Sequence, residues 1–262
     1  MKHLLKPENS IPNVLKNEGK KETLANITTY KSKSLKERSD FEVDIKSSIY
    51  NSKGIKEQLL SYQKGTCCYC ESKIQDISFG DVEHYRPKKG YQQNKADKNL
   101  HKPGYFWLGY DWSNLMVSCE ICNRSFKKNY FPLKKSSARL KSFKTLDVKE
   151  EEPLILNPYE VVYPEKHLEF IGEYESGKTE EGKATVRYCG LYREELNESR
   201  RDKLDSLNAM KNLIELTSGG KKNQALEIFK RQLISRIEFG EFTLMIRYNF
   251  NEYLPEEYKL HL

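Results

Sequence analysis

The chain has 262 residues, which is enough for one large domain or for a small catalytic core with additional segments on both sides. Only 37% of the residues are hydrophobic and 32% are charged, so the large side chains of 17 Tyr and 11 Phe must supply much of the buried surface. No stretch approaches the roughly 20 apolar residues that span a bilayer, and the N-terminus lacks an apolar run of signal-peptide length. These features argue against a membrane protein, and we expect a soluble, cytoplasmic one.

The net charge of +7 is unevenly distributed along the chain. Residues 84–145 contain 14 Lys and Arg and only three acidic residues, a local charge of +11. A basic segment of this kind fits an anionic partner, and nucleic acid is the usual one. A solvated, lysine-rich loop explains the charge equally well. The charge alone does not decide between the two.

The first 65 residues are predicted to form an N-terminal arm and two helices that support the core. Residues 1–34 are polar and weakly patterned, which indicates an extended arm. Ser39 followed by Glu42 is a candidate capping box for a first helix, and a second short helix follows Gly54 and ends at Gly65. The apolar positions of these helices are Phe41, Ile45 and Ile49 in the first, and Ile55, Leu59 and Leu60 in the second.

Residues 66–145 contain nearly all of the candidate chemistry, and we expect them to form the catalytic core. Within this segment, residues 88–104 are polar and are interrupted by Gly90, Pro103 and Gly104, which predicts a long loop.

Residues 146–262 are predicted to form a mainly helical region. Residues 167–174 and 184–188 are candidate short strands on either side of the turn signal at residues 176–177. Further on, two apolar stripes separated by residues 219–220, both Gly, predict an antiparallel helical hairpin. Core packing and the docking of a partner are both possible roles for these stripes. Their residues are Leu204, Leu207, Met210, Leu213 and Ile214, then Leu226, Phe229, Leu233 and Ile237.

Four cysteines form two Cys-x-x-Cys pairs, Cys67 with Cys70 and Cys119 with Cys122, which are separated by 48 residues. Each pair lets two thiolates converge on one cation, and two pairs complete a tetrahedral zinc site. Four thiolates fill the coordination sphere, so this Zn²⁺ is expected to be structural and not catalytic. The alternatives are four unrelated reduced cysteines or a single redox-active pair.

The other cysteines and most histidines have weaker signals. Cys68 lies inside the first pair and is a conceivable ligand, although the x-x spacing favours Cys67 and Cys70. Cys189 is expected to be a small buried apolar residue. His101 lies in the basic loop, where it can approach a substrate, and the remaining histidines are expected to be ordinary structural residues: His3, His167 and His261.

Two runs carry a resemblance to a known family. Residues 81–88 read DVEHYRPK and residues 112–127 read WSNLMVSCEICNRSFK. At these positions the sequence resembles the HNH (ββα-metal) endonucleases. Their pattern is an acidic residue or His followed by His, then Asn-Leu, then Cys-x-x-Cys with a His or Asn directly after it, and a Lys four residues later. Asn114 and Asn123 are nine residues apart, the spacing that the family uses. The resemblance covers about 65 residues.

The resemblance implies a role for each matching residue in phosphodiester hydrolysis, which needs a base for water and a cation to stabilise charge. His84 is the implied general base, because its unperturbed pKa of about 6.5 leaves it largely neutral. Glu83 and Asn123 are the implied ligands of a catalytic divalent ion, and Asn114 ties the hairpin loop that orients His84. Many members of the family have His where this chain has Asn123. An Asn favours Mg²⁺ or Mn²⁺ over zinc, or it indicates a site that has lost its metal.

Two basic residues of the same motifs are candidates for phosphate contact. Lys127 lies one helical turn beyond Asn123 on the same face, and Arg86 follows His84 by two residues.

Short motifs in a larger part of the chain carry a closer resemblance: KP at 6–7, IP at 11–12, CCYCE at 67–71, VEHYRPK at 82–88, NRSFK at 123–127, LNP at 156–158, and residues 185–201 with GLYR at 190–193. With these motifs the chain resembles one branch of the HNH family, the retron-associated and Septu-type (PtuB-like) nucleases of bacterial antiphage defence. That resemblance implies a partner, an ABC-type ATPase (PtuA-like), with retron-derived DNA as a further candidate partner.

The sequence therefore predicts an α+β, mostly helical protein with a ββα-metal core and a structural zinc bound by four cysteines, flanked by helical segments. The predicted function is a metal-dependent HNH endonuclease of an antiphage defence complex. The alternatives are a non-catalytic, zinc-stabilised nucleic-acid-binding module and a stand-alone restriction-type enzyme. The choice between DNA and RNA as substrate stays open, because nothing in the chain resembles a base-reading helix.

Overall fold

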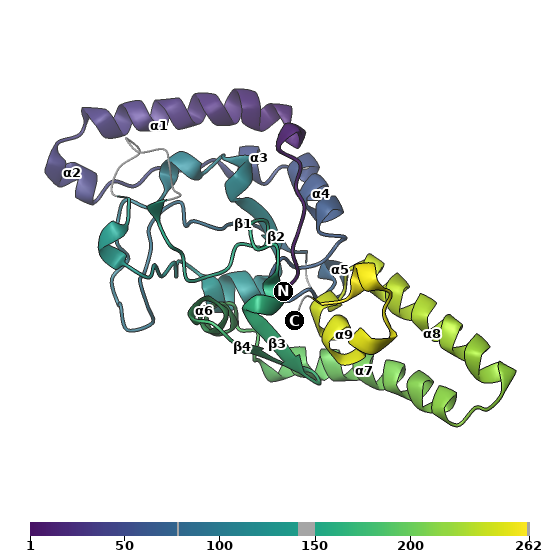
Figure 1. Cartoon of the computed structure of the whole chain (residues 1–262). Coiled ribbons are helices and arrows are strands. Elements are labelled where there is room, and N and C mark those ends of the chain that lie inside the picture. The colour runs from purple at the N-terminus through teal and green to yellow at the C-terminus, as the bar shows by residue number, and fades with distance from the viewer. Residues whose placement is uncertain (78, 141–149, 261–262) are drawn as a thin grey trace.

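The computed structural model describes residues 1–77, 79–140 and 150–260 of the chain (Figure 1). This part is mostly helical and contains two antiparallel sheets of two strands each, which confirms the predicted α+β class. None of its helices is both long and apolar enough to cross a membrane. Two predictions, the segment boundary at residues 145 and 146 and the structural role of His261, lie outside the described residues.

The N-terminal part is helical where the sequence predicts an extended arm. A π-helical turn at Leu15–Gly19 continues into α1 (Lys20–Ser32), which lies along one side of the molecule (Figure 1). Tyr30, one of the two buried residues of α1, packs against Phe41 and Phe106 with ring centroids 5.2 and 5.3 Å away. Because α1 carries no apolar stripe, hydrophobic periodicity does not reveal it, and a few tertiary contacts hold it in place.

The capping box lies five residues before the predicted position, at α2 (Leu35–Ser39). The hydroxyl of Ser34 accepts a hydrogen bond from the backbone N–H of Glu37 at 3.4 Å, and the Glu37 carboxylate accepts one from the backbone N–H of Ser34 at 2.8 Å. Ser39 and Glu42 therefore do not start a helix. The pattern S-x-x-E occurs at both places, and sequence alone does not distinguish them.

Of the two helices expected before the cysteines, the first is much shorter than predicted and the second is present as predicted. Only Ser47–Tyr50 (α3) of the first is helical, although its three predicted core residues, Phe41, Ile45 and Ile49, are all buried. The second is confirmed as α4 (Lys53–Tyr62), and Gly65 follows its end with a φ of 70°. A left-handed residue of this kind stops the helix just before the first cysteine pair.

The hairpin at the centre of the molecule joins strands that are far apart in the sequence. β1 (Asp81–His84) pairs with β2 (Leu115–Ser118), with His84 opposite Leu115. Residues 88–104 of the connection contain neither a helix nor a strand, as predicted. All four residues of β2 are buried, and a π-helical segment at Ile121–Lys127 follows it directly. Two paired strands and a π-helical segment therefore follow one another along this part of the chain.

The second sheet confirms one predicted strand and corrects the other. β3 (Leu168–Ile171) pairs with β4 (Tyr174–Gly177), so the turn lies at Gly172 and not at residues 176–177. Residues 184–188, predicted as a strand, belong to the helix α6 (Glu180–Cys189). Five residues contain too little periodicity to separate the two structures, whereas the helix has clear ends. The hydroxyl of Thr179 caps its start, and Gly190 ends it with a φ of 65°.

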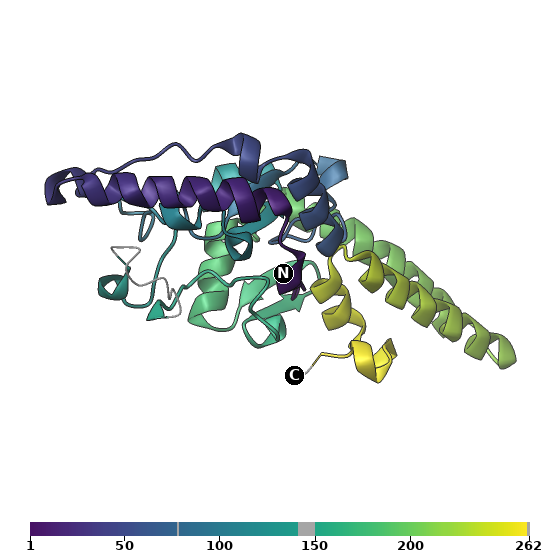
Figure 2. The same ribbon diagram turned by 90° about the horizontal axis from the view of Figure 1, so that it is seen from above.

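The predicted C-terminal hairpin is confirmed. α7 (Glu194–Glu215) and α8 (Gly220–Phe239) project together from the body of the molecule (Figure 2), and α9 (Thr243–Phe250) packs against α8 and β3. Most of the predicted stripes are buried, which supports core packing over docking for Leu204, Leu207, Ile214, Phe229, Leu233 and Ile237.

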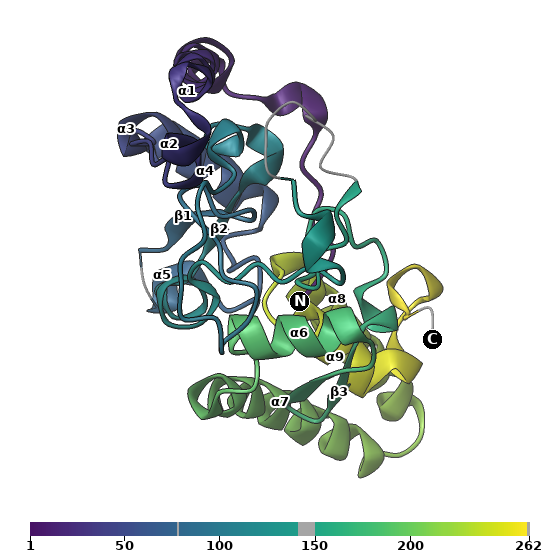
Figure 3. The same ribbon diagram turned by 90° about the vertical axis from the view of Figure 1, so that its left-hand side faces the viewer.

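The central hairpin is enclosed from two sides. The N-terminal helices lie on one side of β1 and β2, and α6 and α7 lie on the other (Figure 3). A single buried apolar core includes residues from all three predicted segments. The segments 1–65 and 146–262 therefore both contribute to the packing that positions the middle one.

Candidate functional site

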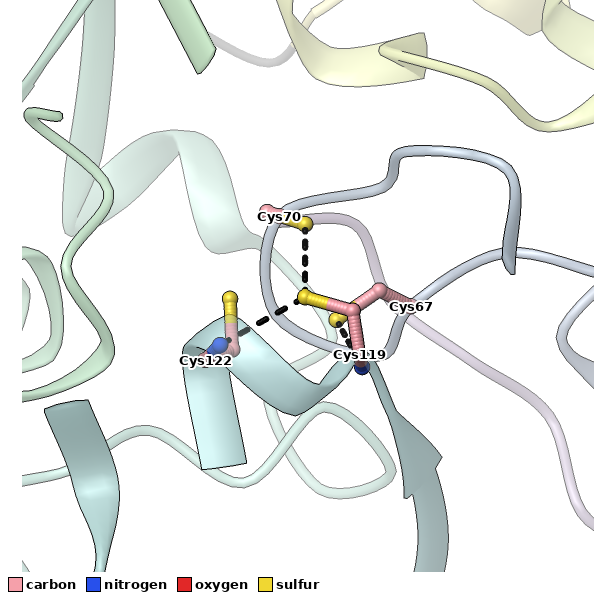
Figure 4. A group of neighbouring side chains, drawn as sticks. All are labelled: Cys67, Cys70, Cys119 and Cys122. Carbon is pink, nitrogen blue, oxygen red and sulfur yellow. Dashed lines mark hydrogen bonds between the residues drawn. The ribbon is translucent and has the colours of Figure 1, made fainter. Parts of the chain in front are cut away.

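Four buried cysteines form a compact cluster (Figure 4). The sulfur atoms of Cys67, Cys70, Cys119 and Cys122 lie within 4.8 Å of one another, and those of Cys70 and Cys119 are 3.8 Å apart. A tetrahedral zinc ion with Zn–S distances of about 2.3 Å separates its sulfur ligands by about 3.8 Å. The predicted set of four residues is therefore the set that the fold brings together, and it can hold a metal ion.

Hydrogen-bond donors point at the sulfur atoms of this cluster. The backbone N–H of Cys119 donates to Sγ of Cys67 at 3.3 Å, and that of Cys122 donates to Sγ of Cys119 at 3.4 Å. The guanidinium of Arg193, just before α7, donates to Sγ of Cys122 at 3.5 Å. Burial by itself would lower the pKa of Arg193, but the neighbouring thiolates raise it above its ordinary value. These donors stabilise negative charge on sulfur, as a metal–thiolate site requires.

The cluster brings together two parts of the chain that are far apart in the sequence. Cys67 and Cys70 lie in the turn before the short helix α5 (Ile74–Ile77), whereas Cys119 directly follows β2 and Cys122 lies at the start of the helical segment Ile121–Lys127. A bound ion therefore joins that turn to the end of the hairpin. This arrangement fixes the start of the helical segment relative to β1.

The remaining cysteines lie outside the cluster, as predicted. Cys68 and Cys189 are buried, and neither sulfur belongs to the group of four. The exposed His101 stacks on Tyr91 and lies 2.9 Å from the carboxylate of Asp97.

The imidazole of His84 lies at the end of β1 and is 5% exposed. Its Nε2 is 2.9 Å from the carbonyl oxygen of Gly109. A carbonyl oxygen only accepts hydrogen bonds, so Nε2 carries the proton of the neutral ring and Nδ1 carries the lone pair. The ammonium of Lys88 lies 3.1 Å from Nδ1, and the ring of Tyr50 in α3 packs edge-on at 4.6 Å.

The surroundings of His84 favour its neutral form. Burial lowers the pKa of His84 well below its ordinary value, and the charges of Lys88 and Lys127 lower it further, while the hydrogen bond to Gly109 acts in the opposite direction. The ring is therefore neutral at neutral pH. An imidazole in this state can accept a proton at Nδ1.

Asn114 holds the two ends of the hairpin connection together. Its Oδ1 accepts a hydrogen bond from the backbone N–H of Arg86 at 2.8 Å, and its Nδ2 donates to the carbonyl oxygens of Arg86 and Leu108 at 3.1 and 3.2 Å. The side chain is buried. The backbone just after His84 and just before Gly109 is therefore tied to one amide, which restricts the orientation of the imidazole.

Lys127 lies in the interior, which corrects the phosphate contact that the sequence predicts for it. Its side chain is 0% exposed, and its ammonium lies 2.5 Å from Oε1 of Glu83 and donates to the carbonyl oxygen of His84 at 3.2 Å. A phosphate group cannot reach an ammonium in this position. Lys127 instead neutralises the buried carboxylate of Glu83 and ties the helical segment to β1.

Arg86 is also buried and ion-paired, so its predicted phosphate contact is corrected in the same way. The guanidinium pairs with Glu151 and lies over the ring of Phe131, with 5.0 Å from its central carbon to the ring centroid. The Glu151 carboxylate also accepts a hydrogen bond from the hydroxyl of Tyr105 at 2.8 Å. These contacts make Arg86 part of the packing beneath the loop.

Asn123 contacts an acidic residue to which the sequence interpretation gave no role. Its Nδ2 donates to Oδ2 of Asp81 at 3.2 Å, and Arg124 donates to the two oxygens of the same carboxylate at 2.7 and 2.6 Å. Because Nδ2 faces Asp81, the Oδ1 of Asn123 is the atom left to coordinate a cation. Asp81 lies two residues before Glu83 on the same strand. Residues two apart on a strand point to the same face, so the spacing of Asp81 and Glu83 was the sequence signal that could have identified Asp81.

One cleft of about 720 Å³ unites the candidate side chains. His84, Glu83 and Asn123 all line it, together with Asp81 and with Tyr50 from the N-terminal helices. Four cations also line it: Lys88, Lys89, Arg124 and Lys128. Four acidic residues line it as well, so the cleft has no excess of positive charge: Glu42, Asp44, Asp81 and Glu83. Its lysines still offer individual contacts to an anionic ligand such as a phosphodiester.

The buried ion pair between Lys127 and Glu83 gives a prediction for stability. Replacing Lys127 with methionine is expected to lower the free energy of unfolding by about 3–5 kcal/mol, because a buried carboxylate loses its cation. Urea unfolding measures the change. Lys128→Met, at the exposed neighbouring residue, removes the same charge and is expected to change stability by only about 0.5 kcal/mol. Equal stability of the two variants would show that the ion pair contributes nothing.

Fold and site together define an α+β protein in which a four-cysteine cluster, able to hold a metal ion, lies between the turn before a two-stranded hairpin and the helical segment that follows the hairpin. The chain is 35% identical over 205 residues to Septu protein PtuB of Bacillus mycoides (strain KBAB4), over 72% of this chain and 68% of that protein. It is 30% identical over 141 residues to Septu protein PtuB of Bacillus thuringiensis, over 53% of this chain and 42% of that protein. No family model matches the chain. The chain belongs to the Septu PtuB family.

Proposed function

We propose that the chain is a metal-dependent endonuclease of the HNH class, which hydrolyses phosphodiester bonds in nucleic acid. The observation that carries this proposal is the cleft in which His84, Glu83 and Asn123 meet at the end of the cysteine-anchored hairpin. A neutral imidazole with its lone pair at Nδ1 is a suitable general base for water. Residues 66–145 form the catalytic core in this proposal, and residues 1–65 and 146–262 support it.

Each residue at the cleft has a proposed task. His84 takes the proton of the attacking water at Nδ1, and Asn114 holds the loop that orients the ring. Glu83 and Asn123 would hold one divalent ion, and their oxygen ligands favour Mg²⁺ or Mn²⁺. When bound, that ion supplies positive charge opposite the phosphate and the leaving oxygen. Asp81 accepts a hydrogen bond from Nδ2 of Asn123 and so leaves the amide oxygen available for the ion.

The four-cysteine cluster is proposed to hold a structural Zn²⁺. Four thiolates leave no open coordination position for water or substrate. The buried sulfur atoms and the N–H donors around them support this assignment. Zinc in this place stabilises the hairpin and the helical segment that carry the catalytic side chains.

We further propose that the protein acts in the cytoplasm as the nuclease of an antiphage defence complex with an ABC-type ATPase (PtuA-like). Membership of the Septu PtuB family supports this part of the proposal. Retron-derived DNA is a further candidate partner. A stand-alone restriction-type enzyme would instead cleave without any ATPase.

The proposed activity is tested with plasmid DNA and RNA, each incubated with the protein in Mg²⁺ or in a Mg²⁺-free buffer, with and without the ATPase. We expect cleavage only in Mg²⁺, and a loss of about tenfold or more in Asn123→Ala, which removes one proposed ligand. Binding of nucleic acid without cleavage in every condition would favour the non-catalytic binding module. Equal cleavage with and without Mg²⁺ would contradict the role of the divalent ion.

A further inference from the structure

The lone pair of the proposed base is occupied by a cation of the protein itself. Nε2 of His84 donates to Gly109, so Nδ1 is the acceptor, and the ammonium of Lys88 lies 3.1 Å from it. An ammonium has only donors. Lys88 therefore donates into the orbital that would have to accept a proton from water.

Lys88 is held at this place by weak contacts. Its ammonium lies 4.5 Å from the centroid of the Tyr50 ring, and among the described residues no carboxylate forms an ion pair with it. Burial lowers the pKa of Lys88 to about 8, with Glu83 opposing that shift, so the side chain is still mostly charged at neutral pH. By contrast, Arg86 and Lys127 are buried in ion pairs with carboxylates. Of these three basic residues in the motif, Lys88 is the one that an incoming anion can attract.

A phosphodiester is a stronger acceptor for an ammonium than an imidazole nitrogen, because its oxygens carry a full negative charge. Lys88 lines the same cleft as His84 and lies four residues beyond it. A phosphate that enters this cleft therefore competes with Nδ1 for the same ammonium. Once Lys88 moves to the phosphate, Nδ1 is free to accept a hydrogen bond from water.

We propose that Lys88 masks His84 in the free protein and contacts the phosphodiester in the complex, so that substrate binding exposes the base. This inference rests on the proposed nuclease function and names the basic residue that contacts the scissile region. It assigns to Lys88 the phosphate contact that the sequence gives to Lys127 and Arg86. The exchange also keeps the base unreactive while no nucleic acid is bound.

The test uses nitrogen NMR of the full-length protein labelled with ¹⁵N-histidine, in which the Nδ1 resonance of His84 reports whether a donor occupies its lone pair. Comparison with a spectrum of His84→Ala assigns this resonance. We expect Lys88→Met to shift it to the position of a free imidazole nitrogen. Lys89→Met removes a neighbouring cation of the same cleft without a contact to His84, and is expected to leave the resonance unchanged.

The second arm adds an oligonucleotide to the wild-type protein without divalent ions, in separate samples of duplex DNA and single-stranded RNA. The inference expects a bound oligonucleotide to move the His84 resonance toward its position in Lys88→Met. A resonance that is identical in the wild type and in Lys88→Met overturns the inference, even if the protein cleaves nucleic acid. A masked base in a protein that never cleaves its substrates instead refutes the proposed function and leaves the contact between Lys88 and His84 in place.

Discussion

Replacing His84 with alanine is expected to lower the cleavage rate by about 10²–10⁴-fold, the usual contribution of a positioned general base. The variant lacks the imidazole whose Nδ1 is proposed to accept the proton of water, while the cleft, Glu83 and Asn123 stay in place. The fold is expected to survive. Removing the ring leaves the Gly109 carbonyl without its donor, which costs about 1–3 kcal/mol. Single-turnover cleavage in Mg²⁺, together with a melting curve, measures both effects.

A matched control for this variant is His101→Ala. His101 is exposed, pairs with Asp97 and does not contact the cleft, so its removal is expected to leave cleavage within about threefold of the wild type. The pH profile gives an independent check. Because burial, Lys88 and Lys127 lower the pKa of His84, the base stays deprotonated below pH 6.5, and the acidic limb of kcat/KM is expected below that value. Cleavage that survives in His84→Ala would remove this residue from the mechanism.

The residues of the site could be predicted from the sequence where the chemistry is local. A Cys-x-x-Cys turn brings two sulfur atoms together by its own geometry, so Cys67, Cys70, Cys119 and Cys122 were identifiable without knowledge of the fold. The partners of Lys127 and Arg86 were not identifiable in this way. Glu151 lies 65 residues beyond Arg86, and only the tertiary structure decides that the two are buried together. From sequence alone, a basic residue in a motif of this kind is interpreted as a phosphate contact. The structure changes that interpretation when it shows a buried carboxylate paired with the basic residue.

The fold shows the same division between local and tertiary information. The C-terminal helices were predicted because Leu204, Leu207, Phe229 and Leu233 form apolar stripes over several turns, and all four are buried. Helix α1 was missed because only a few residues, among them Tyr30 and Ile27, contact the core, and they form no apolar stripe. Tyr30 is buried by residues that come later in the chain, and a single buried apolar residue gives a polar segment no hydrophobic periodicity.

Replacing Cys119 with serine is expected to release the metal and to unfold the core. Structural zinc contributes about 10–16 kcal/mol of binding free energy in small domains, which is comparable with the total stability of about 5–15 kcal/mol of a folded domain. Serine is a poor zinc ligand, and its hydroxyl would also leave the N–H of Cys122 without its present acceptor. Metal analysis should give one zinc per wild-type chain and much less in the variant. The melting temperature should fall by more than in His84→Ala.

Cys68→Ser is the matched control, because Cys68 is equally buried and lies between two of the ligands, yet its sulfur is outside the cluster. It is expected to keep one zinc per chain and to lose only about 1 kcal/mol through the burial of a hydroxyl. If Cys68→Ser and Cys119→Ser lost zinc and stability equally, the ligand set would have to include Cys68. If neither variant changed the metal content, the cluster would not be the zinc site. A fall in the zinc content of Cys119→Ser alone assigns the zinc to this cluster, which lies next to the helical segment that carries Asn123.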